Sequence, residues 1–476
     1  MLAGTAWTSV SVISEKLLGL ITIAFLARLL EPKDFGTVAV CTIVLGIVSN
    51  FSDIGFQSAI IQRQTDVSRA SASAYYMTLA LCALNYLLLF LLAKPIAVFY
   101  GDHAIENIVK ILSLNLVIGS FSRVQNFLLS KNLEFGRKAV CETTPNVVYG
   151  LVSIPLAYSG FGVWSIVYGE LAKNTVRSLL LFFLSRWKPS FVFDFKIARE
   201  LIGYGKHVMF NNILNFASGN IDNAVVGKYL GLTSLSFYKL AYNAAAMPGD
   251  VLYQTVGRVS VPVFSKVQND LEALKHQYFK ILEYAAYIFV PVFAGLFIVA
   301  PGFINLLYGP KWEPAVILFR ALLPFGFASV LKMFSDGLVS STGRPSILPK
   351  ITSIRIVLLI VLLYSILRFG LLPLCIGVSL VQIFVMILQF VFLKRYYNMP
   401  FTLHFKALQA PLIFSMVMMI SVVAIMRLLS GLHLYPTTAL LIEVCSGLLI
   451  YFSLMLLFKK EIVSRLILVR QEWGNR

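Results

Sequence analysis

The chain has 476 residues, of which only 13% are charged while 58% are hydrophobic, and its mean hydropathy is +0.81. A soluble domain carries about 25% charged residues, and a soluble core of this size cannot bury so much apolar side chain. The composition therefore excludes an ordinary water-soluble protein and indicates that much of the surface faces lipid.

Apolar segments long enough to cross a bilayer recur fourteen times along the chain. One spanning helix needs about 20 predominantly apolar residues. The first seven segments cover residues 6–30, 37–58, 73–93, 107–128, 139–159, 162–184 and 205–227. The other seven cover residues 237–256, 281–301, 315–334, 350–368, 371–393, 408–428 and 435–458. Segment 237–256 is the weakest, because it carries Lys239, Asn243 and Asp250.

Segments of this kind predict helices rather than a β-barrel. Lipid offers no hydrogen-bond partner to backbone groups, and the strands of a barrel would alternate apolar and polar residues at every second position. We therefore expect an all-α polytopic membrane protein with about 14 transmembrane helices. The N-terminus lacks the pattern of a cleaved signal peptide, so the first segment is expected to remain as a helix.

The basic residues are concentrated in alternate loops. If the N-terminus lies in the cytoplasm, the inner loops hold 25 of the 40 Lys and Arg residues and the outer loops hold six. This asymmetry follows the positive-inside rule and predicts that both termini are cytoplasmic. It also accounts for most of the net charge of +18, which in a soluble chain would suggest a nucleic-acid partner. We expect no nucleic-acid partner here.

The chain repeats itself at an offset of about 200 to 209 residues. Short matching segments occur in the same order in both halves, most clearly where helices turn. A repeat with an even number of spans predicts two six-helix lobes in the same orientation, related by an axis along the membrane normal. The matching pairs are Arg28–Leu30 with Lys228–Leu230, Tyr100–Gly101 with Tyr308–Gly309, Gly136–Arg137 with Gly343–Arg344, Phe161–Gly162 with Phe369–Gly370, and Leu184–Trp187 with Leu393–Tyr396.

The repeat predicts four parts. Residues 1–186 form the N-terminal lobe, and residues 205–396 form the C-terminal lobe. Residues 187–204 are expected to be a cytoplasmic linker at the membrane surface, with a merely solvated loop as the alternative. Residues 397–476 add two helices and a basic tail that have no counterpart in the repeat.

Both lobes open with a helix that carries a polar stripe. In the first helix, Ser11, Glu15 and Thr22 are spaced so that they share one face. The repeat offset gives the stripe of the second lobe, which consists of Asn211, Asn215, Ser218 and Asp222. A charge near the bilayer centre costs about 2.5 to 3.5 kcal/mol on insertion scales, so both stripes are candidates for the wall of a substrate or ion cavity. Packing between helices is the alternative, because Ser and Asn often hydrogen-bond neighbouring helices.

Four other charged residues belong to the candidate site. Lys16 follows Glu15 and either lines the same cavity or pairs with another helix. Asp53 lies near the cytoplasmic end of the second helix, where a substrate contact and a helix-end contact are equally compatible with its position. Arg28 and Lys228 lie at the outer ends of the first and seventh helices and are interpreted as anchors at the membrane interface.

No motif of an enzyme or a metal site is present. The five cysteines are dispersed singly, and the five histidines form no metal-binding motif. No phosphate-binding glycine loop, catalytic triad or carboxylate pair is legible, so we expect a chain that is not an enzyme, with no catalytic residues, no metal and no cofactor. The sequence does not sort the remaining charges at membrane depth, which are Glu142, Glu170, Lys173, Lys239, Asp250, Arg320, Lys332 and Asp336.

Several stretches resemble signature segments of the polysaccharide exporters. These exporters are a branch of the multidrug/oligosaccharidyl-lipid/polysaccharide flippase (MOP) superfamily, which includes colanic acid and O-antigen exporters. The resemblance covers residues 5–395 well and the last two helices only by their number. The stretches are Ala27–Gly36, Asp53–Phe56 with Ile61–Arg63, Ile221–Asn223 with Gly227–Gly231, Pro262–Ser265, and Leu307–Trp312.

This resemblance implies a flippase that moves a polyprenyl-pyrophosphate-linked oligosaccharide across the bacterial inner membrane by alternating access. Its product would be capsule, exopolysaccharide or the O-antigen of lipopolysaccharide. Lys16 would then suit the pyrophosphate or an acidic sugar, and Glu15 or Asp222 could carry a coupling proton or sodium ion. The expected partners are the lipid-linked oligosaccharide, membrane lipids, and a polysaccharide polymerase and glycosyltransferases of the same pathway.

Two alternatives remain open at this point. The first is an ion-coupled small-molecule or drug antiporter of the multidrug and toxin extrusion type, which shares the two-lobed plan but typically has twelve helices. The two extra helices favour the lipid-linked substrate. The second is a membrane scaffold without transport activity, which would have no need for charges at membrane depth.

Overall fold

The computed structural model describes the backbone of residues 2–52, 54–344, 346–429 and 435–459. It describes the side chains of the same residues except 2–13, 207, 254–255, 258–259 and 436. Helices and short connections make up all of the described chain, which contains no strand. The prediction of an all-α protein is confirmed.

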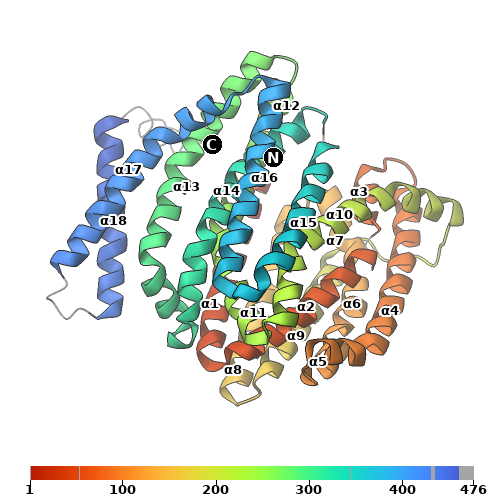
Figure 1. Cartoon of the computed structure of the whole chain (residues 1–476). Helices are drawn as coiled ribbons and strands as arrows, with labels where there is room; N and C mark the ends of the chain where they lie inside the picture. Colours follow the sequence, from red (N-terminus) through yellow and green to blue (C-terminus); the bar gives the residue numbers. More distant parts are fainter. Residues whose placement is uncertain (1, 53, 345, 430–434, 460–476) are drawn as a thin grey trace. The chain divides into compact units, whose positions relative to one another are not determined.

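The first half of the chain forms ten helices within the described residues (Figure 1). They are α1 (Leu2–Leu29), α2 (Pro32–Ser52), α3 (Phe56–Gln62), α4 (Val67–Tyr100), α5 (Ala104–Leu112), α6 (Leu114–Ser120), α7 (Arg123–Lys131), α8 (Phe135–Tyr158), α9 (Val163–Leu184) and α10 (Phe195–Tyr229).

The second half continues with eight α-helices and three short segments of other helix types. The α-helices are α11 (Leu232–Leu252), α12 (Arg258–Lys266), α13 (Leu271–Tyr308), α14 (Pro314–Ser341), α15 (Ile347–Ile366), α16 (Leu371–Tyr397), α17 (Phe401–Leu428) and α18 (Pro436–Phe458). The short segments are the π-helix η1 (Tyr253–Gly257) and the 3-10 helices η2 (Pro310–Trp312) and η3 (Leu367–Phe369).

Each of the predicted spanning segments coincides with a helix or, for residues 107–128, with the bent series α5 to α7. Eight helices of the described residues are long and apolar enough to cross a membrane, and the series α5 to α7, bent by 45°, would be a ninth. The other long helices include α8, α9, α10 and α11, which carry many of the charged and amide side chains. The chain is therefore a multi-pass membrane protein built on the predicted fourteen-helix plan.

The internal repeat is visible in the backbone. α4 and α13 each end in a tyrosine that is followed by a glycine with positive φ, 73° at Gly101 and 93° at Gly309. Positive φ also occurs before α9 and α16, at Gly162 (53°) and Gly370 (97°). Glycine adopts such angles without steric cost, so the matching glycines in the two halves mark the same turns.

The chain forms two compact units whose limits differ from the predicted lobes. Unit 1 consists of Met1–Lys239 and Ile356–Leu371, and unit 2 consists of Leu240–Arg355 and Leu372–Arg476. α10, which would open the C-terminal lobe, belongs to unit 1 because it packs against α2, α3 and α4. The four-part division remains a prediction based on the repeat.

The predicted linker 187–204 is partly helical. The side chain of Asp194 accepts hydrogen bonds from the backbone N–H groups of Lys196 and Ile197, at 2.9 and 3.1 Å, and so acts as the N-cap of α10. α10 therefore begins inside the linker and continues through the predicted seventh span. Phe191 is fully exposed and Phe195 is 83% exposed, which leaves these rings available to lipid.

One buried cluster of unit 1 joins four helix ends. α8 packs against both α1 and α9. A buried apolar cluster of Leu26, Leu30, Val38, Ala157 and Ile166 connects the end of α1 with the start of α2, the end of α8 and the start of α9. These elements therefore run in alternating directions, as consecutive spanning helices must.

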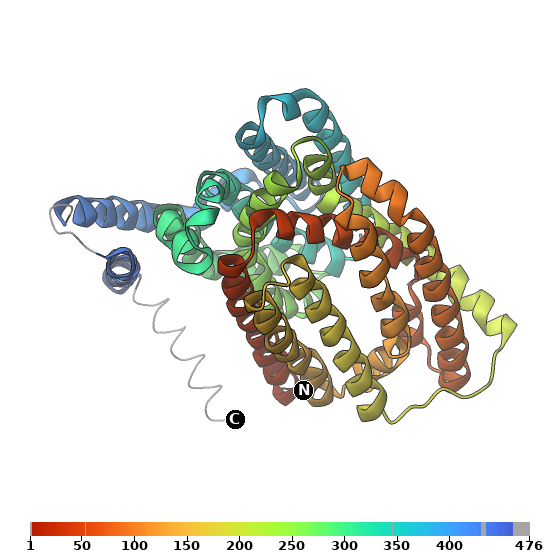
Figure 2. The same cartoon turned by 90° about the horizontal axis from the view of Figure 1, so that it is seen from below.

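The core of unit 2 is centred on α13. This helix packs against α14, α17 and α18, and Figure 2 shows α18 end-on beside α17. Tyr287, Phe414, Met418 and Tyr451 belong to one buried cluster, in which the hydroxyl of Tyr451 donates a hydrogen bond to the Tyr287 carbonyl at 3.1 Å. The two helices outside the repeat are therefore attached to unit 2 through α13.

Gly36, the last residue of the stretch 27–36 that resembles the polysaccharide exporters, permits two helices to approach closely in unit 1. A Cβ atom at Gly36 would lie 1.9 Å from the carbonyl oxygen of Leu232. Only glycine leaves room for α2 to approach the start of α11 this closely.

We expect Gly36→Ala to lower the free energy of unfolding by about 1–3 kcal/mol, because the added methyl group must displace the backbone of α11. Gly19→Ala is the matched control, since a Cβ there meets nothing within 4 Å and alanine is the better helix former. Thermal unfolding of the purified chain in detergent measures both. Equal midpoints for the two variants would contradict the close approach.

An ion pair ties the start of α2 to the turn between α4 and α5. Lys33 Nζ lies 2.9 Å from Asp102 Oδ2, and the other carboxylate oxygen accepts the N–H of Ala104 at 2.9 Å. Burial by itself would raise the pKa of Asp102, but the hydrogen bond and charge of Lys33, together with the Ala104 N–H, hold this pKa below its ordinary value of 3.8.

Asp102→Asn should therefore lower stability at pH 7 by at most about 1 kcal/mol, since Lys33 is largely exposed. A depressed pKa in the folded state stabilises the protein above the ordinary pKa, and this contribution is lost as the pH falls through the folded value. The difference in melting temperature between wild type and D102N should be largest near pH 7 and should shrink as the pH falls below 3.8. A difference that grows on acidification would refute the pairing.

Candidate functional site

The polar stripe of α1 is exposed at one residue and buried at another. Glu15 is exposed and forms no hydrogen bond or ion pair with any described residue. Thr22 is 5% exposed and faces α8, where a Cβ at Gly150 would lie 2.9 Å from its Oγ1. Lys16 is half-buried, and the side chain of Ser11 falls outside the described residues. The position of Thr22 matches the packing alternative that the sequence leaves open.

The stripe of α10 changes from exposed to buried in the same direction. Asn211 and Asn215 are exposed, whereas Ser218 is 3% exposed and Asp222 is completely buried. The two stripes that the repeat relates therefore share one pattern, with exposed residues at the N-terminal end of the described stripe and a buried residue at its C-terminal end. The assignment of both stripes to a cavity remains a prediction.

Asp222 is held in the interior of unit 1. The hydroxyl of Tyr238 donates a hydrogen bond to its Oδ2 at 2.6 Å, and the backbone N–H of Asn223 donates to its Oδ1 at 2.8 Å. These bonds connect α10 with α11 inside the packed part of unit 1. A buried carboxylate with hydrogen-bond donors on both oxygens is a structural tie between the two helices.

The predicted interface residues have different surroundings. The amine of Lys228 donates a hydrogen bond to the carbonyl of Phe99 and lies 4.5 Å from the centroid of its ring, which anchors the end of α10 to α4. Arg28 is exposed at the end of α1. Asp53 lies outside the described residues.

A charged pair lies in the middle of α9. Lys173 Nζ is 3.4 Å from Glu170 Oε1 and 5.4 Å from the ring centroid of Tyr149 on α8. The side chains of Glu170 and Lys173 are both about one quarter exposed. Unit 1 therefore presents a partly accessible ion pair at membrane depth, next to the α8 surface.

A second charged cluster lies between α14 and α16 in unit 2. Lys332 Nζ is 2.6 Å from Asp336 Oδ2, and the side-chain amide of Gln389 donates a hydrogen bond to Asp336 Oδ1 at 2.5 Å. Gln389 is fully buried, and its own Oε1 has no hydrogen-bond partner in the described part of the chain. Each carboxylate oxygen of Asp336 therefore has a partner. The Oε1 atom of Gln389 is an acceptor next to Asp336 that receives no hydrogen bond from a described residue.

A hydrogen-bond chain next to this cluster joins three helices. The Tyr278 hydroxyl on α13 is 3.2 Å from Ser335 Oγ on α14 and 3.3 Å from His404 Nε2 on α17. All three side chains are buried. The helix outside the repeat, α17, is thus linked through Tyr278 of α13 to the same turn of α14 that carries Asp336.

The structure also gives partners to other charges that the sequence leaves unsorted. Arg320 Nε donates to the carbonyl of Phe297 at 2.9 Å, and Lys239 Nζ donates to Thr42 Oγ1 at 3.2 Å. The spacing of Glu170 with Lys173, and of Lys332 with Asp336, is three and four residues, so a search for opposite charges on one helical turn would have found both pairs. The contact of Gln389 with Asp336 could not be found in this way, because Gln389 lies on α16, far along the chain from Asp336.

The residues whose positions are described contain no group of three or more His, Cys, Asp or Glu side chains that could hold a metal ion. Their cysteines are all free thiols. Four of them are buried, whereas Cys445 is exposed on α18. Cys445 is exposed because α18 lies at the edge of unit 2, where few helices cover it.

Comparison with known proteins identifies relatives in polysaccharide synthesis. The chain is 26% identical over 327 residues to the lipopolysaccharide biosynthesis protein WzxC of Escherichia coli K12, covering 68% of this chain and 66% of that protein. It is 24% identical over 350 residues to the teichuronic acid biosynthesis protein TuaB of Bacillus subtilis, covering 72% of each. It is 27% identical over 309 residues to the succinoglycan biosynthesis transport protein ExoT of Rhizobium meliloti, covering 65% of this chain and 63% of that protein.

Solved structures share the fold at low identity. The lipid II flippase MurJ in an inward closed conformation matches with a TM-score of 0.72 and 16% identity, covering 96% of this chain and 99% of that one. An inward-facing multidrug resistance MATE transporter of the MOP superfamily matches with a TM-score of 0.65 and 17% identity, covering 81% of this chain and 94% of that one. These likenesses establish the fold as that of the MOP transporters.

The family model described as "Polysaccharide biosynthesis protein" matches residues 25–317. This match includes α2 to α13, and so contains the α9 charged pair and the polar stripe of α10, whereas the stripe of α1 precedes it. Because it covers more than half of the 476 residues, the chain belongs to the polysaccharide biosynthesis protein family.

Proposed function

We propose that this chain is a flippase that moves a polyprenyl-pyrophosphate-linked oligosaccharide from the inner to the outer leaflet of a bacterial inner membrane. It would act in the synthesis of capsule, exopolysaccharide or O-antigen, with both termini in the cytoplasm. The observation that carries the proposal is the pair of partly accessible charge clusters at membrane depth, one in each unit, in a chain of this family. Charges at that depth are expensive, and they are retained where a polar substrate or ion must pass.

The physical task explains the arrangement. A charged sugar headgroup cannot cross about 30 Å of hydrocarbon unaided, whereas a prenyl tail can remain in lipid. A protein that alternately opens a polar passage to each side supplies the missing hydration and needs no covalent step. We therefore infer a transporter rather than an enzyme.

The second candidate is an ion-coupled drug antiporter, which the likeness to the MATE transporter favours. That likeness extends over 81% of this chain, whereas the likeness to the lipid II flippase extends over 96%. The greater coverage supports the flippase, since an antiporter of the shorter plan has no counterpart for the two last helices.

Lipid extraction distinguishes the two functions. Deleting the gene in its own bacterium should leave the oligosaccharide-lipid on the cytoplasmic leaflet and stop surface polysaccharide synthesis, because the headgroup has no other route. Accessibility of the sugar to a membrane-impermeant probe in right-side-out and inverted vesicles measures this. Normal polysaccharide with increased drug sensitivity would instead support the antiporter.

We also propose that transport is coupled to a proton or sodium gradient through one of the acidic residues at membrane depth. The candidates are Glu15, Asp222, Glu170 and Asp336. An assay of lipid flux in reconstituted vesicles, with either gradient imposed in turn, tests this. A rate that responds to neither gradient would remove these carboxylates from a coupling role.

The cluster around Asp336 gives a specific prediction. Asp336→Asn leaves Lys332 without its ion partner and should destabilise the protein by about 1–3 kcal/mol. The double variant K332M/D336N removes both charges and should recover most of that stability. If the pair serves transport, the double variant will be stable and will still fail to restore surface polysaccharide.

A matched pair elsewhere provides the control. Lys110 and Glu106 on α5 have the same spacing and the same distance of 2.6 Å, with similar exposure of both side chains. The variant E106Q/K110M should therefore be stable and should restore polysaccharide synthesis. Full activity of K332M/D336N would show that its ion pair has only a structural role.

A further inference from the structure

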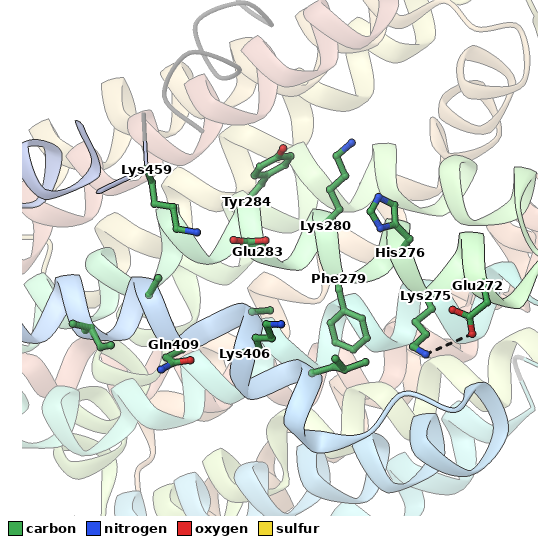
Figure 3. Close-up of a pocket in the computed structure, with 14 residues that line it drawn as sticks. Glu272, Lys275, His276, Phe279, Lys280, Glu283, Tyr284, Lys406, Gln409 and Lys459 are labelled. Atoms are coloured by element: carbon green, nitrogen blue, oxygen red, sulfur yellow. Dashed lines mark ion pairs between the residues drawn. The ribbon is translucent and has the colours of Figure 1, made fainter. Parts of the chain in front are cut away.

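The cytoplasmic end that we predict for unit 2 contains a basic groove between three helices. Its volume is about 940 Å³, and it is lined by the first four turns of α13, the first turns of α17 and the residue after α18 (Figure 3). Four lysines and one histidine line it: Lys275, His276 and Lys280 from α13, Lys406 from α17, and Lys459.

Three of these lysines have no partner among the residues that the structure describes. Lys280, Lys406 and Lys459 form no ion pair or hydrogen bond with any described residue, whereas Lys275 lies 3.6 Å from Glu272. Glu283 is the other acidic residue in the lining, and Figure 3 shows it between Lys459 and Lys406. Four lysines against two glutamates leave the groove with an excess of two positive charges, before His276 is counted.

The groove lies at the level where lipid headgroups are expected. α13 has 38 residues and is therefore about 57 Å long, much longer than the hydrocarbon core of about 30 Å. Its first turns, which carry Lys275 and Lys280, precede the predicted spanning segment 281–301. An unpaired ammonium group at this level faces phosphate groups rather than hydrocarbon.

A largely apolar groove lies further along the same three helices. Its volume is about 490 Å³, and its lining includes Tyr287 to Val299 on α13 together with Met418 on α17 and Leu448 on α18. The α13 part is about 18 Å long, close to the depth of one leaflet, which is about 15 Å. An apolar channel of one-leaflet depth below a basic groove matches the two ends of a phospholipid.

We propose that this composite groove is a binding site for an anionic glycerophospholipid, whose phosphate is held by Lys280, Lys406 and Lys459 and whose acyl chain lies against α13, α17 and α18. Basic pockets between transmembrane helices on the cytoplasmic side bind anionic headgroups through charge-assisted hydrogen bonds. The bound lipid is a resident of the protein rather than its cargo. It fills the apolar groove that α17 and α18 leave against α13.

Native mass spectrometry of the purified full-length chain tests the proposal. The probes are phosphatidylglycerol, phosphatidylcholine and undecaprenyl phosphate, each added to lipid-free protein in detergent. Phosphatidylglycerol should bind with one high-affinity site, and phosphatidylcholine should bind at least about tenfold more weakly because it has no net charge. Equal binding of the two glycerophospholipids would overturn the proposal.

Substitution of the three unpaired lysines locates the site. K280Q/K406Q/K459Q should weaken phosphatidylglycerol binding by roughly fivefold for each charge removed. The control K196Q/K206Q/K350Q removes three lysines that are exposed outside the groove, and it should leave the affinity unchanged. Equal losses in both triple variants would show that only net charge matters and would refute a specific site.

A third variant keeps the test decisive if the triple variant fails to fold. Glu283→Gln removes a negative charge from between two lysines and should tighten phosphatidylglycerol binding roughly fivefold. An unchanged affinity contradicts the proposal.

Two competition experiments identify other occupants of the groove. If undecaprenyl phosphate displaces phosphatidylglycerol at equimolar concentration, the groove binds the carrier lipid instead. If millimolar inorganic phosphate displaces phosphatidylglycerol, the groove is a simple anion site. None of these measurements depends on transport, so the flippase proposal can fail while this one stands.

Discussion

A bilayer supplies no hydrogen-bond partners, and this constraint decides where every polar group of this chain can lie. The helices satisfy their own backbone groups, so the remaining problem is the charged side chains. Glu170 with Lys173, and Lys332 with Asp336, solve it within a single helical turn. Each pair is already neutral when its helix is considered alone, which lowers the cost of placing that helix in lipid before any tertiary contact forms. Gln389 then adds a contact that only the folded unit can provide.

The helical plan could be predicted because it depends on local properties of the chain. Apolar runs of spanning length, turn glycines and the distribution of basic residues are all visible in the sequence. The limits of individual helices were less predictable, because they depend on caps. Asp194 begins α10 well before the apolar segment 205–227, and the predicted span 107–128 is divided into α5, α6 and α7. The short helices α3 and α12 were not expected. These short helices are too brief and too polar to produce a spanning signal.

The candidate site was predictable only as a set of residue types on particular faces. The sequence correctly places Asn211, Asn215, Ser218 and Asp222 on α10, but their burial depends on which helices lie opposite. Asp222 is enclosed because Tyr238 on α11 reaches it, and a tyrosine sixteen residues away has no special signature. For the same reason the repeat did not indicate the compact units. A repeat records which segments correspond to one another, whereas a compact unit depends on the surfaces that pack together.

α17 and α18 show how a unit can be extended without changing its polar interior. Their attachment to α13 is mainly apolar, and it includes hydrogen bonds from Tyr451 to the Tyr287 carbonyl and between His404 and Tyr278. Apolar packing between helices has little driving force in lipid, because the acyl chains are equally apolar. Helices held in this way keep grooves between them that lipid can fill. The His404 bond is therefore the more specific contact, since it connects an added helix to the turn of α14 that contains Asp336. Any displacement of α17 relative to α13 must break or rearrange that chain, which couples the added helices to the charged cluster of unit 2.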